Sequence, residues 1–145
     1  MTEAAARAMN IQLRTLEVRR REDLAGAFAM AREGDAQAVN VFASPFLASL
    51  SWEIIGLAAE HRLPAIYQWR EQVDAGGLVS YGPSLTHMWR QAGVLVAKLL
   101  KGAKPADLPI EQPTKFELAV NTKTAQSLSL NLSPSILIRA DEVIE

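Results

Sequence analysis

The chain has 145 residues, of which 49% are hydrophobic and 21% charged, a balance typical of a globular domain rather than a disordered segment. Its 15 basic and 16 acidic residues leave a formal net charge of −1, so no overall field would attract nucleic acid. Cysteine is absent, which excludes disulfides, thiolate metal sites and cysteine nucleophiles. We therefore expect a single domain, residues 1–145, with a real core and no nucleic-acid partner.

The N-terminal residues do not resemble an export signal, because they lack a basic start, a long apolar run and a cleavage site. No apolar run reaches the ~18 residues that a membrane span requires. Taken as written, this chain would be soluble and would stay in the cytoplasm.

The first third of the chain predicts alternating helices and strands. Residues 2–9 predict a short alanine-rich helix, and residues 11–18 alternate apolar with polar side chains, with one slip, as a strand does. A helix is predicted over 22–33, because apolar side chains recur at helical spacing and Gly34 stands where a C′ glycine belongs. Residues 38–43 are short, β-branched and apolar, which is typical of a buried parallel strand.

The middle of the chain continues this alternation. Ser44 followed by Pro45 has the pattern of a helix start, and the helix is expected to run to about Arg62. Three more elements follow at short intervals, a strand, a short helix and a strand: residues 64–67, 70–77 and 77–81. Strands that alternate with helices over short connections indicate an α/β fold, with a mostly parallel sheet and helices on both faces.

The last third predicts one long helix and several short elements. Residues 84–101 are amphipathic over their whole length, which is typical of a helix that packs along one face. After a turn-rich link, residues 116–121 alternate as a strand does, and a short helix is expected over 122–128. Residues 134–145 predict one more helical turn.

Polar and aromatic side chains follow the predicted strands, at the edge where parallel sheets bind ligands. The candidate ligand-binding residues are Ser44, Tyr67, Arg70, Ser80 and Tyr81. Tyrosine offers a flat apolar face with a polar handle, and arginine grips a carboxylate through two parallel hydrogen bonds. This set suits a small ligand with an apolar body and a carboxylate.

Three of the candidates, Ser44, Tyr67 and Arg70, also have a purely structural explanation. Helix capping explains Ser44 or Ser84 more readily than ligand contact does, although one serine can do both. Tyr67 and the neighbouring Trp69 would complete the core, with Arg70 in solvent, if no ligand binds there.

Catalytic and metal sites find no support in the sequence. The only histidines, His61 and His87, lie far apart and have no second ligand at helical spacing. The stretch VSYGPS is not a nucleophile elbow, and the chain has no glycine-rich phosphate loop. We therefore expect neither an enzyme nor a metal or cofactor site.

Several motifs are similar to those of the ABC transporter substrate-binding proteins typified by tryptophan and tyrosine transport: RLPAIY, AGGLVSYG, VAKLLKGAKPADLPIEQPTKFELAVN and ADEVIE. Members of this family resemble type I periplasmic binding proteins, in which two α/β lobes close on a ligand. The resemblance implies that this chain corresponds to the C-terminal half of such a protein and that the ligand is a small carboxylate such as an aromatic amino acid. It also implies a periplasmic location and an ABC permease as partner. Tyr67, Ser80 and Tyr81 match positions of these motifs, and Arg70 lies in the longer similar stretch that joins RLPAIY to AGGLVSYG, whereas Ser44 rests on its place after a strand.

The resemblance assigns residues 1–82 to βα units of a second lobe. Residues 83–145 would supply a crossing helix, a strand and C-terminal segments that contact a first lobe, which this sequence does not contain. Exposed apolar surface and an unpaired strand edge then predict weak ligand binding and a homodimer. The alternative is a truncated cytoplasmic sensor or dimerisation domain with a vestigial pocket.

Overall fold

A computed structural model describes residues 2–145, and the chain divides into two compact units, up to Ala36 and from Gln37 to Glu145. The first unit contains α1 (Thr2–Ala8) and α2 (Asp23–Glu33), which confirms both predicted helices. The apolar stripe predicted for α2 is buried at all four positions: Leu24, Ala27, Phe28 and Ala31. The left-handed residue that follows α2 is Asp35, with φ of 53°, and not Gly34 as expected.

The strand predicted over residues 11–18 is wrong. This segment is irregular, and within residues 2–145 it pairs with no strand of the sheet. Leu16 and Val18 are half-buried, whereas Ile11 and Leu13 are exposed. Burial therefore follows the apolar positions only in the last part of the segment. Alternation predicts which side chains share a face, but a strand also needs a partner for its backbone hydrogen bonds.

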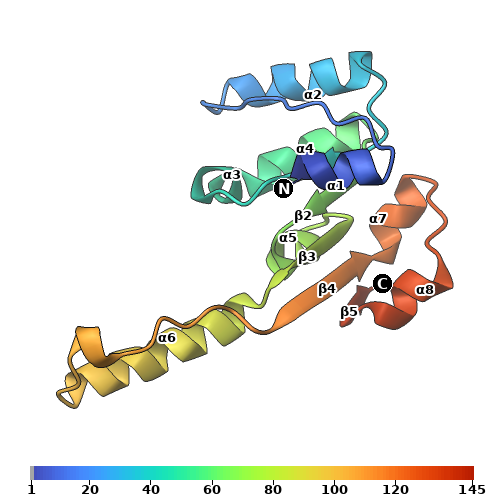
Figure 1. Ribbon diagram of the computed structural model, residues 1–145. Helices are drawn as coiled ribbons and strands as arrows, with labels where there is room; N and C mark the ends of the chain where they lie inside the picture. The colour runs from blue at the N-terminus through green and yellow to red at the C-terminus, as the bar shows by residue number, and fades with distance from the viewer. Residues whose placement is uncertain (1) are drawn as a thin grey trace. The chain divides into compact units, whose positions relative to one another are not determined.

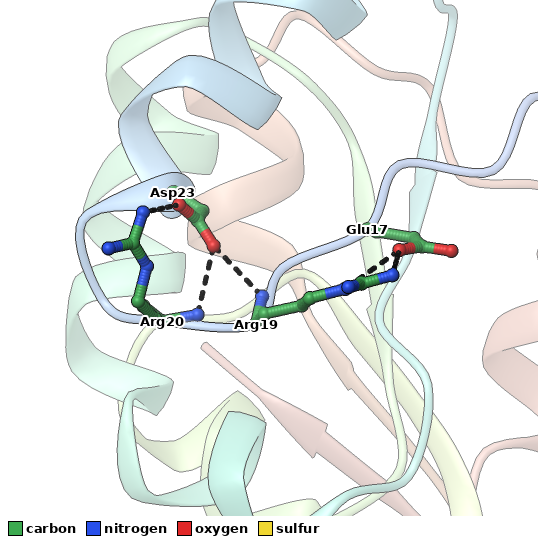
Figure 2. Close-up of polar contacts among 4 residues, drawn as sticks. All are labelled: Glu17, Arg19, Arg20 and Asp23. Carbon is green, nitrogen blue, oxygen red and sulfur yellow. Dashed lines mark hydrogen bonds and ion pairs between the residues drawn. The ribbon is translucent and has the colours of Figure 1, made fainter.

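The turn before α2 is held by one carboxylate (Figure 2). Asp23 Oδ2 accepts the backbone N–H groups of Arg19 and Arg20 at 3.0 and 2.9 Å, and these bonds hold the pKa of Asp23 below its ordinary value. The Arg19 guanidinium pairs with Glu17 at 2.6 Å. The carboxylate of Asp23 therefore fixes the backbone of the turn that precedes α2, at the helix end where the helix dipole favours a negative charge.

The second unit contains a five-stranded sheet with the order β1-β2-β3-β4-β5 (Figure 1). Its strands are β1 (Val39–Asn40), β2 (Ala65–Tyr67), β3 (Val79–Pro83), β4 (Phe116–Asn121) and β5 (Glu142–Ile144). The β1–β2, β2–β3 and β4–β5 pairs are parallel, and the β3–β4 pair is antiparallel. The predicted α/β fold with a mostly parallel sheet is confirmed.

The helix predicted from Ser44 to Arg62 is divided into α3 (Pro45–Ser49) and α4 (Ser51–Glu60). Leu50 separates them, and the hydroxyls of Ser49 and Ser51 donate to the carbonyls of Phe46 and Ala48, both at 2.7 Å. Such side-chain bonds compete with the regular helical ladder, which explains the break.

The C-terminal prediction was half right. A helical turn is present as α8 (Pro134–Arg139), but β5 follows it and extends the sheet beside β4. The remaining helices match their predicted positions: α5 (Arg70–Asp74), α6 (Leu85–Leu100) and α7 (Thr122–Ser127), with a 3₁₀ turn, η1, at Pro105–Asp107.

The core of the second unit lies where α4 and α5 meet the central strands. Val73, Ala119 and Val120 are completely buried, and Ile54 and Leu63 are 2% exposed. Connecting β1 to β2 and β2 to β3 in parallel requires crossovers, and α4 and α5 supply them.

Helix α6 projects away from this sheet, and the segment after it returns along its length to β4 (Figure 1). We call residues 85–115 the arm. All 16 residues of α6 are described, and none of them is buried. Across residues 2–145, no helix is both long enough and apolar enough to cross a membrane.

Candidate functional site

A shallow hollow of about 190 Å³, part of it open to solvent, lies beyond the carboxyl ends of β1 and β2. Its lining includes Phe42 and Ser44 after β1, Leu47 from α3, and Trp69 and Gln72 after β2. Two parallel strands end here side by side, which is the place where sheets of this kind bind ligands. The hollow therefore combines aromatic walls with a hydroxyl and an amide.

Ser44, one of the predicted ligand-binding residues, lines this hollow. Its backbone is extended at φ of −155°, and its carbonyl accepts the Ala48 N–H at 2.8 Å, but its side chain makes no capping bond to any described residue. Ser84 does act as a cap, because its Oγ accepts the His87 N–H at 3.4 Å. The sequence favoured helix capping for both serines, but in the structure only Ser84 caps a helix through its side chain.

Trp69 and Gln72 line the hollow although neither is among the five candidate residues. The Trp69 N–H donates to Gln72 Oε1 at 3.0 Å, and Gln72 Nε2 donates to Ser51 Oγ at 2.9 Å. Gln72 is only 6% exposed, so this amide joins the starts of α4 and α5 beneath the hollow. A glutamine three residues after the residue that precedes a helix, as Gln72 is after Trp69, is a capping pattern that the sequence did display.

Tyr67 and Ser80 are neighbours in the sheet and belong to the core rather than to the hollow. Tyr67 is 3% exposed, its ring lies against Gly77, and burial raises the pKa of its phenol to about 12. Ser80 pairs with it across the ladder and is 1% exposed. Of the buried side-chain polar atoms in residues 2–145, Ser80 Oγ alone has no hydrogen-bond partner.

Arg70 pairs with carboxylates of the protein itself. Its guanidinium lies 3.5 Å from Asp74 on the same helix and 3.3 Å from Glu142 on β5, and its side chain is 42% exposed. It is not part of the hollow's lining. The arginine therefore connects α5 to the far edge of the sheet.

Tyr81 is 60% exposed and stacks on Phe116 across the β3–β4 pair, with ring centroids 5.9 Å apart. Both rings lie where the chain leaves the sheet for the arm and returns from it. The five predicted residues consequently occupy four settings: Ser44 in the hollow, Tyr67 and Ser80 in the core, Arg70 in ion pairs and Tyr81 at the start of the arm. Within the described residues, no cluster of three acidic or histidine side chains is arranged to hold a metal ion.

Solved structures with the same fold are about twice as long as this chain. One is a conserved domain protein from Vibrio cholerae, with a TM-score of 0.87 and 20% identity, covering 97% of this chain and 47% of that one. Another is an ABC domain in complex with L-Trp from Streptococcus pneumoniae, with a TM-score of 0.85, 24% identity and coverages of 97% and 48%. Identities this low establish the fold alone.

A third structure is a ligand-free, open substrate-binding protein with adhesive properties from Clostridium difficile, with a TM-score of 0.66, 16% identity and coverages of 99% and 48%. A search of curated proteins gave no match. A family model described as ABC transporter substrate binding protein matches residues 1–144, which confirms the resemblance read from the motifs. This family is one of binding proteins and not of enzymes. Since the match spans almost the whole sequence, the chain belongs to the ABC transporter substrate binding protein family.

Proposed function

We propose that this chain is the ligand-binding half of the solute-binding component of an ABC importer. Its ligand is a small molecule with an apolar, aromatic body and a carboxylate, such as an aromatic amino acid. The observation that carries this proposal is the hollow at the carboxyl ends of β1 and β2, with Phe42, Trp69 and the uncapped hydroxyl of Ser44 in its wall.

The chemistry of the hollow supports an aromatic ligand. Phe42 is 50% exposed and Trp69 is half-buried, so both have aromatic surface that a flat apolar ligand would cover. The Ser44 hydroxyl supplies a donor beside them for a carboxylate oxygen. The structure from Streptococcus pneumoniae, described in complex with L-Trp, is compatible with this ligand class.

The size of the hollow supports binding between two lobes. Ligand pockets usually measure ~300–1,000 Å³, whereas the space that a water molecule can occupy in this hollow is only about 10 Å³, and its empty volume of about 190 Å³ includes open solvent. A ligand placed here would be enclosed from one side only, so we expect the isolated chain to bind weakly. Residues 1–82 would form the second lobe, and residues 83–145 would cross toward a first lobe.

The partners follow from this role. In the importer, the protein would act in the periplasm and deliver its ligand to an ABC permease, which would sense the closure of the lobes. The isolated chain would also pair with a second copy through the arm, since Trp89 is 73% exposed and Leu100 is 84% exposed.

A thermal-shift screen against aromatic amino acids and related carboxylates tests the binding proposal. A ligand that binds only the folded chain raises its stability, by ~2.7 kcal/mol at a hundred times its Kd. Trp69→Ala should remove the shift, whereas Trp52→Ala, a matched change at an exposed residue outside the hollow, should retain it. Absence of a shift with every compound, or a shift that survives in Trp69→Ala, would sink the proposal.

A second candidate is a cytoplasmic sensor or dimerisation domain whose pocket no longer binds a ligand. The observation that favours it is the exposed apolar face of α6, which is suited to a protein partner. Both candidates are compatible with a dimer, so the thermal shift distinguishes them. A tight dimer by size-exclusion chromatography with light scattering, without any thermal shift, supports the second candidate, and stabilisation by an aromatic acid supports the first.

A further inference from the structure

The hollow has two walls that come from different loops. The wall after β1 includes Ser44 and Ala48, and the wall after β2 includes Trp69 and Gln72. The registered part of the β1–β2 pair is only two residues long, so both walls lie beyond the paired part of the sheet. Contacts outside the ladder must therefore hold the walls in place relative to each other.

Hydrogen bonds of one amide join the two walls. Gln72 Oε1 accepts the Trp69 N–H at 3.0 Å, and Gln72 Nε2 donates to Ser51 Oγ, at the start of α4, at 2.9 Å. The Ser51 hydroxyl donates to the Ala48 carbonyl at 2.7 Å, and the Ala48 N–H donates to the Ser44 carbonyl at 2.8 Å. These bonds form a continuous path from Trp69 to Ser44.

The chemistry of Gln72 suits this position. The Trp69 N–H can only donate, so the amide oxygen must face it and the amide nitrogen faces Ser51. A carboxylate in the same place would accept bonds but could donate none. Since Gln72 is only 6% exposed, losing either partner would leave a buried polar atom unsatisfied, and both bonds therefore favour a single side-chain conformation.

The break between α3 and α4 brings Ser51 into this path. The hydroxyls of Ser49 and Ser51 both turn back to carbonyls of α3, each at 2.7 Å. Ser51 also accepts the bond from Gln72, whereas Ser49 has no such contact within residues 2–145. The two serines thus differ in one respect, the link to the other wall.

We propose that Gln72 is a positioning residue of the hollow, which holds Trp69 in a fixed place relative to the wall at Ser44 through its bond to Ser51. The inference rests on the proposed function only in treating the hollow as the ligand site, because the hydrogen bonds form without a ligand. A wall that is ordered before binding reduces the entropy that a ligand loses to order it, so Ser51 strengthens binding without lining the hollow.

Amide hydrogen exchange measured by NMR tests the positioning without a ligand. Gln72→Met keeps a similar side-chain length and removes both bonds, so the Trp69 N–H should exchange about fivefold faster, as expected for one lost hydrogen bond. Ser51→Ala removes only the link to the other wall, and exchange should be about twofold faster. The indole N–H resonance of Trp69 should shift in both variants, whereas that of Trp89, on the arm, should not.

The matched control is Ser49→Ala, which removes a hydroxyl bond of the same length to α3 but leaves the path through Gln72 intact. It should change neither the exchange rate nor the indole resonance of Trp69. Adding Ser51→Ala to Gln72→Met should not speed exchange further, because both changes interrupt the same path. Unchanged exchange in a folded Ser51→Ala chain, or equal acceleration in Ser49→Ala, overturns the proposal even where Gln72→Met does not fold.

Calorimetric titration with L-tryptophan separates this inference from the proposed function. Ser51→Ala should weaken binding about twofold relative to the parent chain, and Ser49→Ala should bind as the parent chain does. If the parent chain does not bind while Ser51→Ala still speeds Trp69 exchange, the proposed function is contradicted and the positioning by Gln72 is supported. Equal affinity in the parent chain and in Ser51→Ala would overturn the effect of this bond on binding.

Discussion

In the second unit, the arm and the remaining residues, 37–84 and 116–145, which we call the body, bury their apolar side chains very differently. In the body, Leu63 is 2% exposed and Val73 is completely buried, whereas in the arm Leu100 is 84% and Trp89 73% exposed. Yet α6 is strongly amphipathic, and its apolar side chains recur at helical spacing. Amphipathicity therefore indicates that a helix has a face suited to burial, but not whether the same chain supplies the surface that covers it.

Truncating one leucine in each region should produce the largest contrast. Leu63→Ala should destabilise the chain by about 2–5 kcal/mol, because it leaves a cavity in a packed core. Leu100→Ala should change stability by less than ~0.5 kcal/mol, as exposed truncations usually do. Urea unfolding of both variants measures the difference. A large loss in Leu100→Ala that grows with protein concentration would instead show that the arm is buried between two chains.

The two tyrosines sharpen the comparison at high pH. Burial raises the pKa of Tyr67 from 10.0 to about 12, so the stability it contributes is fully present below pH 10 and is lost as the pH rises toward 12. The expected loss is ~2–3 kcal/mol, since each unit corresponds to 1.36 kcal/mol. Unfolding measured from pH 9 to 12 should show this loss in the parent chain and in Tyr81→Phe, but not in Tyr67→Phe. If Tyr67→Phe loses as much stability between pH 9 and 12 as the parent chain, the loss does not come from the ionisation of Tyr67.

The two serines that begin helices provide the smallest contrast. Ser84→Ala should destabilise the chain by about 1 kcal/mol, because it removes the hydrogen bond that caps α6. Ser44→Ala should change stability by less than ~0.5 kcal/mol, because its hydroxyl caps no helix in the described chain. Thermal unfolding monitored by circular dichroism measures both. Equal losses would mean that Ser44 caps α3 in solution.

Local patterns predicted the elements for which the local signals and the tertiary structure agree. The stripe of α2, the N-cap of α6 and the β2 and β3 strands lie where spacing and capping residues placed them. The segment over 11–18 and strand β5 were mispredicted, because forming a ladder depends on a partner far away in sequence. The break at Leu50 was missed because it depends on serine hydroxyls that turn back onto the helix backbone.

The candidate site was predicted less well than the fold. Position after a strand selected both Ser44 and Tyr67, but whether a side chain points into the hollow or the core depends on the pleat and on what packs beneath it. Arg70 found its carboxylates on α5 and β5, the latter 72 residues further along the chain, and no spacing rule predicts such a pair.

By itself, the sequence determined the α/β class, most of the helices and the family, because short-range spacing and motifs are sufficient for these. Only the tertiary structure decided that Tyr67 is core, that Trp69 and Gln72 complete the hollow, and that the arm remains uncovered. The physical reason is that burial and charge pairing depend on which residues are in contact in the folded chain, and these residues are often far apart in the sequence.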